Sequence, residues 1–121
     1  MVLGIGTDIV KISRIKRFIG REDENSIDVI LTSKEARSRK NAQSVAGVFA
    51  VKEALLKALG IGFTKGIGRL LEIEVLNDDG GKPYVVTSGV VRDILCQKRI
   101  NCIEVSISHD TDYAIAFVIC Q

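Results

Sequence analysis

The longest regular element that the sequence predicts is a helix over residues 43–59. Apolar side chains recur along it at helical spacings, and Gly60 follows as a C-terminal cap. Four glycines then stand within nine residues, between positions 60 and 68, which neither a helix nor a strand interior tolerates well. The sequence therefore predicts one long helix followed by a loop with unusual backbone freedom.

Shorter elements are predicted on both sides of this helix. Apolar and β-branched runs indicate strands at residues 2–9, 71–76, 83–86, 102–108 and 113–119. Further helical segments are expected at residues 9–19, 27–31, 33–40 and 88–98. Turn residues at 77–81 and 110–112 join strands into two hairpins. Strands mixed with segregated helices are typical of an α+β fold, here in a single domain spanning residues 1–121.

Composition narrows the class of protein. The chain is 46% hydrophobic and 26% charged, which is typical of a soluble globular domain, and its net charge of +2 is too small to indicate nucleic-acid binding. No basic segment precedes the first apolar residues, and no apolar run approaches the roughly 18 residues of a membrane span. Three cysteines without a C-x-x-C spacing favour a reducing cytoplasm.

Glu53, Lys57 and Gly60 share one stripe of the long helix. An acid and a base one turn apart form an ordinary surface ion pair in most proteins, worth about 0.2–0.5 kcal/mol. A second carboxylate, Asp8, emerges at the end of the first strand, where it serves either as a helix N-cap or as a ligand. Because magnesium is held by one or two carboxylates together with phosphate oxygens, Asp8 and Glu53 are a candidate metal pair.

Two further features have a structural and a functional interpretation. The glycine-rich loop lacks the Gly-Lys-Ser/Thr of a Walker A motif, so it is either a flexible connector or a place where backbone N–H groups approach an anion. His109 is the only histidine and follows a predicted strand. It is either a structural residue or a contact for phosphate near neutral pH.

The first predicted helix is strongly basic. No acidic residue stands between Asp8 and Glu22, whereas Lys11, Arg14, Lys16, Arg17 and Arg21 do. The usual interpretation is a solvated face. With Ile15 and Phe18 as apolar anchors, the same face suits the docking of an acidic helical partner.

Four motifs in order along the chain resemble a known family, the small bacterial holo-acyl-carrier-protein synthases, which are 4′-phosphopantetheinyl transferases. The motifs are Gly4-Ile5-Gly6-Thr7-Asp8-Ile9-Val10 with Arg14, Phe49-Ala50-Val51-Lys52-Glu53-Ala54 with Lys57, Ala58 and Gly60, Gly81-Lys82-Pro83, and Val105-Ser106-Ile107-Ser108-His109. The resemblance spans nearly the whole chain.

The resemblance implies an α+β phosphopantetheinyl transferase fold and a specific reaction. The enzyme would transfer 4′-phosphopantetheine from coenzyme A to a serine hydroxyl of apo acyl carrier protein, leaving adenosine 3′,5′-bisphosphate, in support of fatty acid biosynthesis. It would be a cytoplasmic homotrimer with its sites between subunits, without nucleic-acid or membrane partners.

The resemblance also assigns roles to residues. Asp8 and Glu53 would bind Mg²⁺, and Lys57 would assist the leaving phosphate. Glu53 would deprotonate the serine directly or through a water. Coenzyme A contacts would come from Lys57, Gly60, Gly66, Lys82, Pro83, Ser108 and His109. Carrier contacts would come from Arg14, Ile15, Arg17, Phe18 and Arg21.

The chain departs from the family pattern at three places. Val48 stands where many relatives have an arginine, Glu104 replaces a frequent histidine, and residues 22–29 lack the basic and aromatic residues that help the carrier dock. A rival hypothesis is a non-catalytic module whose basic helix holds an acidic protein or RNA. In that case Asp8, Glu53 and His109 would be structural.

Overall fold

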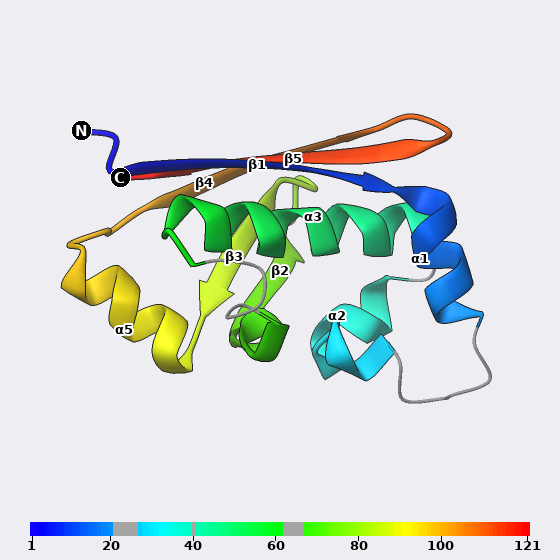
Figure 1. Cartoon of the computed structure of the whole chain (residues 1–121), viewed down its shortest axis with the longest axis horizontal. Coiled ribbons are helices and arrows are strands. Elements are labelled where there is room, and N and C mark those ends of the chain that lie inside the picture. The colour runs from blue at the N-terminus through cyan, green and yellow to red at the C-terminus, as the bar shows by residue number, and fades with distance from the viewer. Residues whose placement is uncertain (21–26, 40, 62–66) are drawn as a thin grey trace.

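A long helix, α3 (Ala42–Ala58), runs through the middle of the molecule (Figure 1). The computed structural model describes residues 1–20, 27–39, 41–61 and 67–121. The side chain of Asn41 caps α3 by accepting a hydrogen bond from the Ser44 N–H (2.8 Å). Gly60 follows the helix with φ +75°, a left-handed conformation that favours glycine. The long helix predicted from the sequence is therefore confirmed, shifted by one residue at each end.

One side of α3 is covered by a three-stranded antiparallel sheet (Figure 1). Its strand order is β1-β5-β4, formed by β1 (Gly4–Lys11), β5 (Tyr113–Cys120) and β4 (Ile103–His109). Ala116 of β5 is in register with Asp8 on one side and Ile107 on the other. Because β5 is the central strand, the first and last segments of the chain share one layer.

Two glycines let β1 lie directly against the backbone of α3. A Cβ atom at Gly6 would overlap the carbonyl oxygen of Ala54, and one at Gly4 would come within 2.6 Å of the Ala58 carbonyl oxygen. Since alternate residues of a strand share a face, Asp8 points to the same side as these glycines. The Gly-x-Gly pattern thus brings the Asp8 carboxylate against α3.

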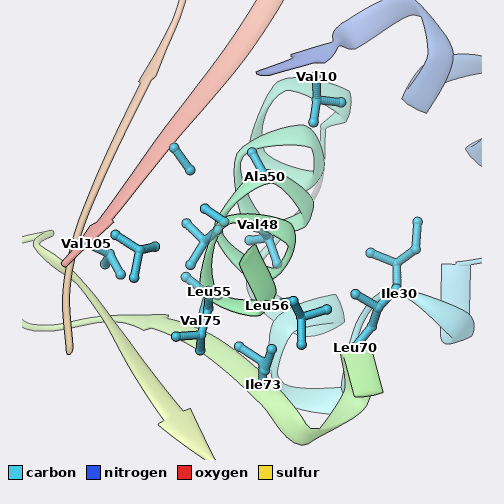
Figure 2. Packing of buried hydrophobic residues seen from close by; sticks show 14 of the residues in the cluster. Val10, Ile30, Val48, Ala50, Leu55, Leu56, Leu70, Ile73, Val75 and Val105 are labelled. Carbon is cyan, nitrogen blue, oxygen red and sulfur yellow. The ribbon is translucent and has the colours of Figure 1, made fainter. Parts of the chain in front are cut away.

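The opposite side of α3 packs on a second, smaller sheet. β2 (Ile73–Asn77) and β3 (Pro83–Thr87) form an antiparallel hairpin. Figure 2 shows Leu55 and Leu56 of α3 beside Val75 and Ile73 of β2. These side chains belong to a core in which α3 is buried on nearly all sides, from Val45 through Leu56 except at Phe49.

Short helical elements complete the fold. They are α1 (Ile12–Ile19), the 3₁₀ helices η1 (Ile27–Val29) and η2 (Ile67–Glu72), α2 (Ser33–Ser38) and α5 (Gly89–Gln97). Thr32 begins α2 with a capping box, since its Oγ1 accepts from the Glu35 N–H while the Glu35 carboxylate accepts from the Thr32 N–H.

The boundaries differ from the predictions where the backbone changes type. The strand predicted at 71–76 begins at Ile73, because Ile67–Glu72 forms a 3₁₀ helix. The first strand begins at Gly4 and extends to Lys11. Residues 62–66 of the predicted glycine-rich loop lie outside the described residues.

Cys96, Cys102 and Cys120 are free thiols. None of the helices in the described ranges is long and apolar enough to cross a membrane.

The outer face of the three-stranded sheet, which we call the outer sheet face, is rich in exposed apolar side chains. Leu3 precedes β1 and is also exposed. The exposed apolar residues on the strands are Ile5 and Ile9 of β1 and Tyr113, Ile115 and Phe117 of β5. Ile5 and Ile9 are 62% and 60% exposed. Contiguous apolar surface of this kind on a small protein is typical of an interaction site.

Candidate active site

Asp8, Glu53 and Lys57 come together where β1 passes the second half of α3. Asp8 lies within β1 and not at its end, and the N-cap of α1 is Lys11, so the prediction of Asp8 as a helix cap is wrong. The ammonium of Lys57 lies 3.0 Å from Asp8 Oδ1 and donates a second hydrogen bond to the Thr7 carbonyl oxygen (3.2 Å). No Glu53–Lys57 ion pair occurs among the described residues, so the simple surface pair is not what this helix forms. Lys57 instead links α3 to β1.

Glu53 is a buried carboxylate, and one of its oxygens lacks a hydrogen-bond partner among the described residues. Its residue is only 6% exposed, and Oε1 has no hydrogen-bond partner among the described residues. Burial raises the pKa of Glu53, the nearby charge of Asp8 raises it further, and Lys57 opposes both. A buried polar atom without a partner costs stability, and this oxygen keeps its capacity to accept a hydrogen bond or to bind a cation.

A hollow of about 460 Å³, which we call the acidic hollow, opens beside these three residues. Its other walls are apolar, from Val29 and Ile30 before α2 and from Phe49 on α3. Its lining residues are Asp8, Ile9, Val10, Arg14, Ile15, Phe18, Val29, Ile30, Phe49, Glu53, Lys57 and Leu70. An apolar hollow with a few convergent polar groups is typical of a ligand site.

The basic helix contributes to the same hollow. Arg14 is exposed on α1 and lines it together with Phe18, which is partly buried. Ile15 also lines the hollow but is 5% exposed and belongs mainly to the core. Arg17 is exposed and does not line it, and Arg21 lies outside the described residues. The predicted carrier face therefore adjoins the predicted catalytic residues.

A second hollow of about 300 Å³, which we call the histidine hollow, contains other predicted coenzyme A residues. His109, the last residue of β4, and Pro83, the first of β3, both line it. The remaining lining residues are Arg39, Asn41, Gln43, Ser44, Gly47, Asn77, Gly81 and Ile107. The acidic and histidine hollows share no described lining residue, so Lys57 lies in a different hollow from Pro83 and His109.

Three other predicted coenzyme A residues, Ser108, Lys82 and Gly60, line neither hollow. Ser108 is exposed on the outer sheet face, in register with Ile115, whereas its neighbour His109 points to the opposite face. Lys82 is exposed and forms an ion pair with Glu104 (3.2 Å), one of the residues that depart from the family pattern. Gly60 is exposed beyond α3, and Gly66 lies outside the described residues.

Sequence reasoning missed Arg39. Its guanidinium donates to the Val75 carbonyl oxygen (3.2 Å), Asn77 Oδ1 (3.3 Å) and Ser44 Oγ (3.3 Å), while its buried Nε has no partner among the described residues. Burial lowers the pKa of Arg39, and Glu35 opposes that effect. No local pattern marks this residue, because two of its three partners, Val75 and Asn77, are far away in sequence.

Asp8 and Glu53 suit a hard divalent cation whose remaining ligands are oxygen atoms of a substrate and of water. No group of three or more His, Cys, Asp or Glu side chains able to hold a metal occurs in the part of the chain that the structure describes. Two carboxylates, Asp8 and Glu53, interact closely enough for one charge to raise the pKa of the other. Magnesium is commonly bound by one or two carboxylates plus phosphate oxygens and water, so these residues suit it.

Comparison with known proteins identifies the family. The sequence model of the 4′-phosphopantetheinyl transferase superfamily matches residues 4–118. A holo-[acyl-carrier-protein] synthase of Fusobacterium nucleatum is 43% identical over 122 residues, covering 98% of each chain.

Solved structures agree with the sequence match. The holo-[acyl-carrier-protein] synthase from Neisseria meningitidis has a TM-score of 0.87 at 31% identity and covers 100% of this chain and 99% of its own. The Helicobacter pylori enzyme, solved in complex with coenzyme A, has a TM-score of 0.81 at 32% identity, with 97% and 99% coverage. The predicted α+β fold is thus confirmed, and the chain belongs to the 4′-phosphopantetheinyl transferase superfamily, among the holo-acyl-carrier-protein synthases.

Proposed function

We propose that this protein transfers 4′-phosphopantetheine from coenzyme A to a serine hydroxyl of an apo acyl carrier protein, with Mg²⁺ as cofactor, and releases adenosine 3′,5′-bisphosphate. The observation that carries the proposal is the buried Glu53 carboxylate. Its unpartnered Oε1 lies near Asp8 in a hollow that the basic helix also lines. The reaction would supply carriers for fatty acid biosynthesis in the cytoplasm.

Asp8 and Glu53 are the residues that would hold Mg²⁺. Bound there, the ion would polarise the phosphoryl group and offset negative charge on the leaving phosphate. Because burial and Asp8 raise the pKa of Glu53, ionisation of this carboxylate is costly in the protein alone and becomes favourable beside a cation.

Lys57 would stabilise the departing bisphosphate. Its side chain is 56% exposed and its ammonium already reaches across to Asp8, so it can turn toward an incoming phosphate once a cation takes its place beside the Asp8 carboxylate, which is only 15% exposed. Glu53 has a free acceptor atom suited to take the serine proton, directly or through a water. The apolar walls of the acidic hollow would exclude bulk water from that transfer.

The division of coenzyme A residues between two hollows supports a site formed by two subunits. A second copy could bring its histidine hollow, with His109, Pro83 and Arg39, to the acidic hollow of the first. The apolar outer sheet face supplies a surface for such assembly. We therefore propose a homotrimer in which each site uses residues from neighbouring subunits.

A direct assay tests the transfer. The protein is incubated with coenzyme A, Mg²⁺ and an apo acyl carrier protein, and the carrier is weighed by mass spectrometry. The expected result is a mass gain of one phosphopantetheine group, absent when the carrier serine is replaced by alanine. Failure to modify any of several acidic carriers would overturn the proposed function.

A mixing experiment tests the shared site. Glu53→Gln and His109→Ala variants are each expected to be weakly active, since they damage opposite halves of the site. After the two are unfolded and refolded together, trimers that pair an intact acidic hollow with an intact histidine hollow should regain part of the activity. If mixing restores nothing although ultracentrifugation shows mixed trimers, the site lies within one subunit.

A further inference from the structure

Lys52, the neighbour of Glu53 in the sequence, is the centre of a buried hydrogen-bond network. Lys52 and Glu35 are both 0% exposed, and the Lys52 ammonium lies 2.7 Å from Glu35 Oε1. The ammonium also donates to the Ile30 carbonyl oxygen at 2.6 Å. One lysine on α3 therefore connects to α2 through Glu35 and to the segment before α2 through Ile30.

The Glu35 carboxylate extends the network to the second sheet. Its Oε2 accepts a hydrogen bond from the Val75 N–H of β2 (2.8 Å), and its Oε1 accepts one from the Thr32 N–H (2.9 Å). Thr32 Oγ1 in turn donates to Glu74 Oε2 (2.6 Å). These directional bonds fix α3, α2 and β2 relative to one another more narrowly than apolar contacts alone would.

Stability alone is a weak account of this ion pair. The desolvation of two buried charges offsets most of their attraction, and well-packed apolar residues often replace such pairs without loss. What apolar residues cannot reproduce is a bond of fixed length and direction. Here that bond runs from α3 to Ile30, and Ile30 and Val29 form one wall of the acidic hollow while Glu53 forms another.

We propose that Lys52 is a positioning residue for the reaction: its bonds to Glu35 and Ile30 set the distance between the wall at residues 29–30 and the Glu53 carboxylate. The proposal deepens the proposed function and rests on it for the meaning of the hollow. Lys52 itself touches no reacting group, and it acts by holding the wall and the helix turn that carries Glu53.

The test separates positioning from stability with a double substitution. Lys52→Met alone leaves the Glu35 charge buried without its partner and should unfold more easily. Lys52→Met with Glu35→Leu removes both charges and should recover part of the melting temperature, the remainder being lost with the acceptor of the Val75 and Thr32 N–H groups. Lys34→Met, on the exposed surface of α2, is the matched control and should behave as the natural protein does.

Two readouts are taken on the recovered double variant. The kcat for transfer should fall about tenfold or more while the KM for coenzyme A stays unchanged, because small displacements of positioned groups lower rates steeply. Amide hydrogen exchange of Ile30 and Leu31, whose N–H groups bond to the Ile27 carbonyl oxygen, should accelerate. A stable double variant with natural kcat, or with natural exchange at both amides, would overturn the proposal.

The exchange measurement needs no substrate, so it decides the structural part even if the natural protein modifies no carrier. If the apolar double variant fails to fold, Lys52→Gln with Glu35→Gln replaces it. That neutral pair keeps hydrogen-bonding groups but loses the charged bond to Ile30, and the same two readouts then apply with the same outcomes.

Discussion

Two consecutive residues of α3, Lys52 and Glu53, are both charged and both buried, yet their surroundings are opposite. Lys52 is enclosed by bonds of 2.6 Å to Ile30 and 2.7 Å to Glu35. Glu53 has an oxygen without any partner among the described residues and lies beside another carboxylate, Asp8.

The direction of the pKa shifts shows the same contrast. Burial lowers the pKa of Lys52, and its partner Glu35 counteracts that effect. For Glu53, burial and Asp8 act in the same direction, and Lys57 opposes them. One helix turn thus holds a charge whose hydrogen bonds are made within the fold and a carboxylate with one oxygen that has no partner among the described residues. The comparison shows that burial of a charged side chain does not by itself indicate a ligand site, whereas a buried oxygen without a partner is a candidate ligand atom.

The largest effect should come from Glu53→Gln, measured as transfer rate. The amide keeps the shape of the carboxylate but cannot carry the charge that a cation needs. We expect a loss of about a thousandfold in kcat/KM, or about 4 kcal/mol of transition-state stabilisation. Asp8→Asn should act in the same direction. Circular dichroism should show both variants folded, and full activity in both would refute the metal assignment.

Loss of the carboxylate that pairs with Lys52 should lower the stability of the protein. Glu35→Leu leaves the Lys52 ammonium buried without its carboxylate and should lower the free energy of unfolding by about 3 kcal/mol. Urea titration followed by fluorescence or circular dichroism measures this. The exposed pair Lys82–Glu104 is the matched control, and Glu104→Gln should leave stability within experimental error. Equal losses in both variants would erase the distinction between buried and surface pairs.

Much of the fold follows from local sequence. The helix predicted over 43–59 and the two hairpins depend on neighbouring residues, and the structure has each of them. The 3₁₀ helix at Ile67–Glu72 was not predicted. Apolar periodicity cannot separate such a turn from the start of a strand.

The site could be predicted only in part. The spacing of Glu53 and Lys57 suggested an ordinary ion pair, and only the fold shows that Lys57 bonds to Asp8 instead. Lys52 gave no signal at all, since a lysine is almost never fully buried and its partner is 17 residues away. Tertiary packing decides which distant residues form such hydrogen bonds, and no local pattern in the sequence reveals them.

A smaller effect is expected on the carrier side of the acidic hollow. Arg14→Glu should raise the KM for the carrier about tenfold, equivalent to about 1.4 kcal/mol, because it reverses a charge that attracts an acidic partner. The KM for coenzyme A should not change. Lys98→Glu, an equal charge reversal just beyond α5, is the control. The prediction fails if both reversals weaken carrier binding equally, which would indicate net charge and not a docking face.

The smallest effect concerns the stability of the metal-free protein as pH changes. The pKa of Glu53 is raised above its ordinary value of 4.5, so the folded state holds this proton more tightly than the unfolded state does. As pH rises from 4.5 through the folded pKa, the natural protein therefore loses stability that Glu53→Gln does not lose.

Near neutral pH, with a chelator present, the glutamine variant should be more stable by about 1 kcal/mol, because it removes a buried charge with an unpartnered oxygen. The difference should shrink as pH falls through 4.5, because below this value Glu53 becomes protonated in the unfolded state as well as in the folded state. Thermal unfolding of both proteins across this interval measures it. Mg²⁺ with coenzyme A should then stabilise the natural protein but not the variant, because only the ionised carboxylate of Glu53 binds the cation. A difference that did not vary with pH would mean that Glu53 is satisfied by the fold, as Lys52 is.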